Sequence, residues 1–105
     1  MRRIRSSELL ALIINEDIPE VSILYSELYD IKEELRRDMI FCDFTVMDFE
    51  DLYISYPRNV TIHMDRVILS SKEVSDKSFW ASLVAGKDSK EEARIIEILK
   101  KYLKK

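Results

Sequence analysis

The sequence predicts an α+β fold, in which a three-stranded antiparallel meander is flanked by two N-terminal and two C-terminal helices. Two observations support this prediction. Apolar residues recur at helical spacing in the first and last thirds of the chain, whereas in the middle third they alternate with polar residues. The chain of 105 residues is long enough to bury a hydrophobic core of its own. We therefore expect a single domain over residues 1–105.

The two N-terminal helices are predicted from capping residues that precede apolar positions. Ser6 or Ser7 can cap a short first helix, which should end near Asn15. A second, longer helix should begin around Pro19, because apolar residues then recur every three or four positions. These residues are Val21, Leu24, Leu28, Ile31 and Leu35.

Three strands are predicted where the apolar period changes to two. The first alternates from Ile40 to Val46, the second covers residues 52–56 and the third covers residues 60–64. A proline at the second position of residues 56–59 favours a tight turn between the last two strands, and residues 48–51, three of which are acidic, supply the other connection. Such short connections join antiparallel neighbours, which predicts a meander.

Two more helices are predicted in the C-terminal third. Ser75 can cap the first of them, and Gly86, the only glycine of the chain, sits where a residue in the left-handed conformation would end it. Asp88 and Ser89, followed by Glu92, form a capping-box pattern before the last helix. The complete predicted order is α-α-β-β-β-α-α.

Composition excludes several functional classes. Walker and dinucleotide-binding motifs need several glycines, so the single glycine excludes them, and we expect no cofactor. Cys42 is the only cysteine, which rules out an internal disulfide and favours an intracellular, cytoplasmic protein. No segment approaches the roughly 20 apolar residues of a membrane span. The absence of glutamine, together with many lysine, arginine and glutamate residues, is typical of thermophile proteins.

The expected sheet carries large apolar side chains on its odd-numbered face, where solvent-facing residues should be polar. These candidate interface residues are Phe41, Met47, Phe49 and Tyr53, accompanied by His63. Residues 16–51 contain twelve acidic and three basic residues, a net charge of −9, which suits a basic partner. We therefore expect a non-enzymatic protein–protein interaction module, either a homodimer or a small subunit of an assembly, and assign no catalytic residue.

Nucleic-acid binding is the first alternative function. Arg2, Arg3 and Arg5 form a basic arm that can neutralise phosphates. A winged-helix arrangement can also be drawn over residues 6–64, but its recognition helix would present Glu33 and Glu34 to the phosphates and repel them.

A magnesium-dependent phosphoryl-transfer or nuclease-type enzyme is the second alternative. Its candidate ligands are the carboxylates of Asp43, Asp48, Glu50 and Asp51. Clustered carboxylates at strand ends can hold Mg²⁺. Three of the four lie in a predicted connection, however, where acidic residues are also common because they are well solvated.

Overall fold

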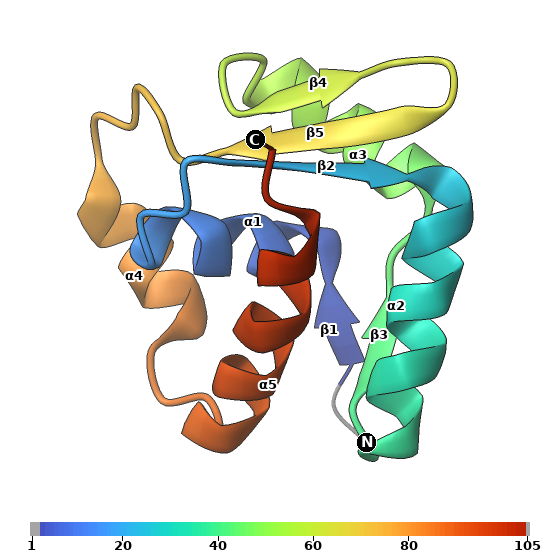
Figure 1. Ribbon diagram of the computed structural model, residues 1–105. Helices are drawn as coiled ribbons and strands as arrows, with labels where there is room; N and C mark the ends of the chain where they lie inside the picture. The colour runs from blue at the N-terminus through green and yellow to red at the C-terminus, as the bar shows by residue number, and fades with distance from the viewer. Residues whose placement is uncertain (1–2, 105) are drawn as a thin grey trace.

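The computed structural model describes residues 3–104, which form an α+β fold with five α-helices and two small β-sheets (Figure 1). In chain order the elements are β1 (Arg3–Arg5), α1 (Ser6–Asn15), β2 (Glu20–Leu24), α2 (Tyr25–Arg37), β3 (Phe41–Asp43), α3 (Val46–Ser55), β4 (Val60–Ile62), β5 (Arg66–Ser70), α4 (Lys77–Val84), α5 (Ser89–Leu99) and a 3₁₀ turn, η1 (Lys100–Tyr102). One sheet is antiparallel with the order β2-β5-β4, and the other is a parallel pair of β1 and β3. The predicted order α-α-β-β-β-α-α with a three-stranded meander is therefore wrong.

The first error concerns residues 20–24, which form strand β2 and not the start of a helix. Val21 and Ile23 are buried and pair with Leu69 and Val67 of β5, so the local period is two. Helix α2 begins only after Leu24, whose backbone N–H donates to Oε1 of Glu27 at 2.8 Å. Pairing with a strand more than 40 residues away therefore overrides the helical spacing of the apolar residues.

The second error concerns residues 46–55, which form helix α3 in place of a connection and a strand. Phe49 is buried, and Leu52, nearly one turn later, packs against the core. The buried apolar residues of this segment are therefore spaced as in a helix and do not alternate as in a strand. The supposed odd-numbered sheet face does not exist, because Met47, Phe49 and Tyr53 lie on a helix.

Helix α1 is the centre of the core. Six consecutive residues, 9–14, are buried, so the helix is apolar on all sides. It runs beneath the three-stranded sheet and is also in contact with α3, α4 and α5 (Figure 1). With ten residues α1 is far shorter than a membrane span. Within residues 3–104, no helix combines the length and apolar character needed to cross a bilayer.

The three-stranded sheet has one buried face and one more polar face, as is usual for antiparallel sheets. The buried face carries Val21, Ile23, Val60, Val67 and Leu69. The end of the chain meets β2 near the start of the strand (Figure 1): Val21 forms a bridge with Leu103, and the N–H of Lys104 donates to the carbonyl of Glu20 at 3.0 Å. Among the described residues, Glu20 and Val21 at the start of β2 thus have backbone partners on both sides of the strand.

The two C-terminal helices are those that the sequence predicts. Gly86 has a φ of 75° shortly after α4, and the carboxylate of Asp88 accepts hydrogen bonds from the first N–H groups of α5. The N-cap of α4 is Asp76 and not Ser75.

Candidate functional site

Helix α3 is held in place by its cap and by one aromatic contact. Thr45 Oγ1 accepts from the N–H of Asp48 at 3.3 Å, and Oδ2 of Asp48 accepts from the N–H of Thr45 at 2.8 Å, which is a capping box. On the inner face, the ring of Phe49 meets that of Phe44 edge to face, with 5.7 Å between the centroids. One flank of α3 is consequently fixed against the core, and the opposite flank faces solvent.

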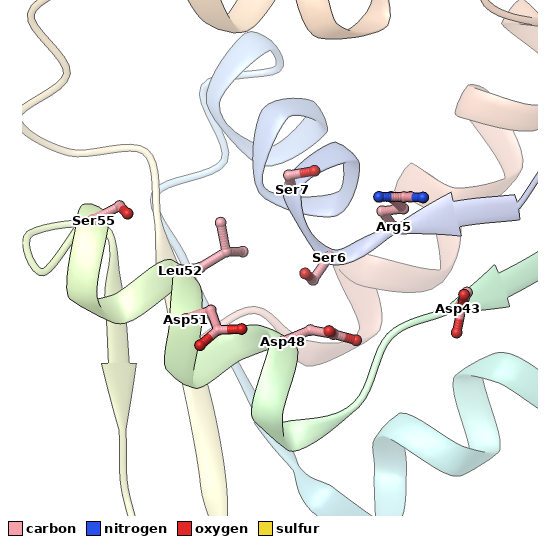
Figure 2. Close-up of a pocket in the computed structure, with 8 residues that line it drawn as sticks. All are labelled: Arg5, Ser6, Ser7, Asp43, Asp48, Asp51, Leu52 and Ser55. Carbon is pink, nitrogen blue, oxygen red and sulfur yellow. The ribbon is translucent and has the colours of Figure 1, made fainter.

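An open pocket of about 460 Å³ lies between α3 and the start of α1 (Figure 2). From α3 it is lined by Asp48, Asp51, Leu52 and Ser55, and from the two parallel strands and α1 by Arg5, Ser6, Ser7 and Asp43. Arg5 and Asp43 end their strands in register with each other, which brings segments 38 residues apart to the same rim. The pocket therefore depends on the pairing of β1 with β3.

The pocket is acidic. It contains three carboxylates and one guanidinium, a net charge of −2 among its described lining residues. Asp48 is engaged in the helix cap, but the side chains of Asp43 and Asp51 make no hydrogen bond or ion pair within residues 3–104. Ser6, only 7% exposed, points its hydroxyl into the pocket and has no hydrogen-bond partner in the described part of the chain (Figure 2). These groups are free to receive a cationic ligand.

The four candidate magnesium ligands are only partly brought together. Asp43, Asp48 and Asp51 line the pocket, whereas Glu50 lies near Tyr25, where it adds to the effect of burial in raising the pKa of the tyrosine. Among residues 3–104, no three acidic, histidine or cysteine side chains are placed to hold one metal ion. The pocket thus gathers three of the four candidate carboxylates without placing them around one point.

The candidate interface residues are dispersed. Met47 and Tyr53 are exposed on α3 at 73% and 45%, but Phe49 is fully buried. Phe41 is half-buried in β3, and His63 is exposed in the turn between β4 and β5. Sequence reasoning missed Ile54, which is 77% exposed. Its spacing of seven residues from Met47 would have identified it, had the segment been interpreted as a helix.

The basic arm is only partly described, because Arg2 lies outside residues 3–104. Arg3 and Arg5 are exposed, and alternate residues of a strand point to the same side. Arg5, however, borders the acidic pocket and is paired in register with Asp43. Carboxylates at this position would repel a phosphate backbone.

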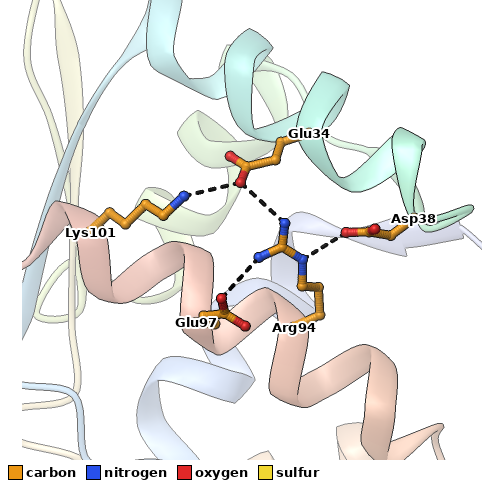
Figure 3. Close-up of polar contacts among 5 residues, drawn as sticks. All are labelled: Glu34, Asp38, Arg94, Glu97 and Lys101. Atoms are coloured by element: carbon orange, nitrogen blue, oxygen red, sulfur yellow. Dashed lines mark hydrogen bonds and ion pairs between the residues drawn. The ribbon is translucent and has the colours of Figure 1, made fainter.

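A second cluster of charges connects α5 and η1 to α2 (Figure 3). Arg94 Nε donates to Oδ2 of Asp38 at 2.7 Å, and its Nη2 donates to Oε1 of Glu34 at 3.2 Å. Lys101 Nζ donates to the same oxygen of Glu34 at 3.0 Å, and Nη1 of Arg94 lies 3.3 Å from Oε1 of Glu97. Every charge in this cluster has a partner within the protein, so its role is to hold the helices together.

Acid should weaken this charge cluster through Glu34. The hydrogen bond from Lys101, with a contribution from Arg94, holds the pKa of Glu34 below its usual 4.5, so protonation favours the unfolded chain. The stabilisation is complete above pH 4.5 and is lost as the pH falls through the lower, folded-state pKa. We expect Glu34→Gln to lower the unfolding free energy by about 1 kcal/mol at pH 7 and to reduce the acid dependence of Tm.

Thermal melts between pH 7 and pH 3 test this expectation. Glu33→Gln is the matched control, because Glu33 lies on the same helix and makes no ion pair within the described residues. The control should retain the acid dependence of the parent protein. Coincident curves for Glu34→Gln and the parent would contradict the assignment.

Comparisons of this chain with protein-family models, with curated protein sequences and with solved structures found no match.

Proposed function

We propose that the protein is a non-enzymatic interaction module in which helix α3 binds a basic segment of another protein. The observation that carries this proposal is the exposure of Met47 and Ile54 on a helix whose neighbouring flank lines an acidic pocket. Exposed apolar side chains that lie beside charged groups are characteristic of recognition surfaces.

The apolar pair and the pocket adjoin each other. Met47, Asp51 and Ile54 follow one another at intervals of four and three residues, so they share one face of α3 over about 10 Å. Asp51 also lines the pocket. A bound segment can therefore contact the apolar side chains and the carboxylates at the same time.

Affinity and selectivity would come from different parts of this surface. Complete burial of an apolar side chain contributes about 1.5–3 kcal/mol, so Met47 and Ile54 can supply most of the binding energy. An exposed ion pair contributes only about 0.2–1 kcal/mol, but complementary charge accelerates association and rejects acidic partners. Asp43 and Asp51 would thus select a basic segment.

The charge also favours a different protein over a second copy. A two-fold symmetric contact through α3 would bring the carboxylates of both copies into one interface, because such a contact uses the same patch twice. Residues 16–51, with their net charge of −9, would add to this repulsion.

A labelled peptide tests the proposal directly. The probe is a fluorescein-tagged peptide with leucine and lysine at helical spacing, and its counterpart has glutamate in place of lysine. Fluorescence anisotropy should detect binding of the basic peptide only. The double variant Met47→Ser with Ile54→Ser should weaken binding about tenfold or more, because the lost burial exceeds about 1.4 kcal/mol.

Charge variants complete the test. Asp43→Asn with Asp51→Asn should reduce the salt dependence of binding, whereas Asp30→Asn, an exposed acid of α2, should leave it unchanged. Equal binding of both peptides, or no effect of the α3 variants, would refute the proposal. Light scattering that shows a dimer abolished by Met47→Ser would refute the choice of partner. If the parent protein is retained on immobilised DNA and the double variant Arg3→Ala with Arg5→Ala is not, the result would support the nucleic-acid alternative instead.

A further inference from the structure

A second pocket, of about 320 Å³, lies between α4 and the loop that joins β5 to α4. Three aromatic residues, Tyr56, Phe79 and Trp80, form part of its wall. Two acidic residues, Glu73 and Asp76, line the same pocket. It shares no residue with the α3 surface or with the acidic pocket beside it.

The aromatic rings are steeply inclined to one another. The ring of Tyr56 lies 4.7 Å from that of Trp80 at an angle of 63°, and the ring of Phe79 lies 5.2 Å from it at 81°. Trp80 is buried, but Phe79 is 43% exposed on the first turn of α4. Both contacts are edge to face, so the three rings pack on one another, and the exposed part of Phe79 offers an accessible aromatic surface at the pocket. An accessible electron-rich ring attracts an organic cation.

The carboxylates of the pocket are charged and accessible. Oδ1 of Asp76 accepts from the hydroxyl of Ser78 at 2.6 Å and from the N–H of Phe79 at 3.3 Å, and these bonds lower the pKa of Asp76. Oε2 of Glu73 lies 4.0 Å from Nε of Arg58, and both side chains are largely exposed. The Glu73 carboxylate therefore already attracts a guanidinium at the rim, through a contact weak enough to be displaced.

We propose that this pocket binds an organic cation, an alkylammonium or guanidinium group, against the rings of Phe79, Tyr56 and Trp80 and within reach of the carboxylates of Glu73 and Asp76. The rings stabilise the alkylated face of the cation by cation–π attraction. The carboxylates balance its charge. Lys77, the cation of this chain nearest to Asp76 in sequence, is paired with Asp17. This inference is independent of the function proposed for α3.

Tryptophan fluorescence reports on the pocket itself, because Trp80 is the only tryptophan of the chain. Titration with tetramethylammonium chloride should give a saturable change in emission. Sodium chloride at equal ionic strength and tert-butanol, a neutral molecule of similar shape, should give none. Phe79→Leu, which keeps an apolar residue in the helix, should weaken binding about 2- to 30-fold.

Acidic variants separate the contribution of charge from that of the rings. Glu73→Gln should weaken binding of tetramethylammonium several-fold, whereas Glu16→Gln, an exposed acid outside the pocket, should not. The inference is overturned by a linear emission change, by equal binding of tert-butanol, or by unchanged affinity in both Phe79→Leu and Glu73→Gln. The affinities of an arginine-containing peptide and of N-acetylarginine amide should then be compared. Tighter binding of the peptide would identify a protein as the source of the cation, whereas equal affinities of the two would identify a small free amine or guanidine.

Discussion

Replacing Phe49 with alanine should lower the unfolding free energy by about 3–5 kcal/mol, the usual cost of removing a buried phenylalanine. Phe49 is fully buried at the middle of α3 and contacts Phe44 edge to face. Its removal would leave a cavity between α3 and the core and would abolish that contact. Urea denaturation followed by circular dichroism measures the change.

Met47→Ala is the matched control for Phe49. Met47 lies two residues before Phe49 on the same helix and is 73% exposed. Its replacement should change the unfolding free energy by less than about 0.5 kcal/mol. The pair also tests the fold itself. If residues 46–55 were an extended strand, positions 47 and 49 would lie on the same face and the two substitutions would have similar effects.

Asn59→Ala should lower the unfolding free energy by about 2–4 kcal/mol, because it leaves two carbonyl groups without their donors. The side-chain amide of Asn59 donates to the carbonyl of Ser70 at 2.9 Å and to that of Lys72 at 2.8 Å. The backbone carbonyl of Asn59 also accepts from the N–H of Ser70 at 2.9 Å. This buried residue therefore joins the start of β4 to the end of β5 and to the loop beyond it. Thermal and urea unfolding measure the loss.

Asn59→Asp distinguishes lost hydrogen bonds from lost volume. The side chain keeps its size but replaces two donors with acceptors that face the carbonyls. At pH 7 it should be at least as destabilising as alanine. Protonation of the introduced carboxyl restores one donor, so the difference in Tm from the parent should narrow as the pH falls towards 4. A near-neutral effect of Asn59→Asp at pH 7 would show that these hydrogen bonds contribute little.

The helices with local signals could be predicted from the sequence, and the elements defined by distant contacts could not. The apolar run of residues 9–14, the cap at Asp88 and the stop at Gly86 are all signals that lie within or beside their helices. Strand β2 differs, because Val21 and Leu24 satisfy helical spacing and only the pairing with β5 makes the segment extended. Strand β1 is only three residues long, and its extended conformation depends on pairing with the parallel strand β3.

Helix α3 was predictable in principle. Thr45 and Asp48 match the capping-box pattern, but the alternation from Ile40 onwards favoured a strand through Val46. The acidic pocket, likewise, could be predicted only where its residues are close in the sequence. The sequence brings Asp48 and Asp51 together because one turn of helix separates them, whereas the contributions of Arg5 and Ser6 require the β1–β3 pairing.

The position of residues 103–104 beside β2 has a consequence for aggregation. A strand with an unpaired edge can recruit a strand from another molecule, and long open edges are the usual starting points of intermolecular sheets. In the described chain residues 103–104 cover the start of the outer edge of β2, and the opposite edge of that sheet is the three-residue strand β4. So short an edge is a poor template for a strand of another molecule. The protein is thereby protected from aggregation at high concentration, which matters for a chain with so large an apolar interior.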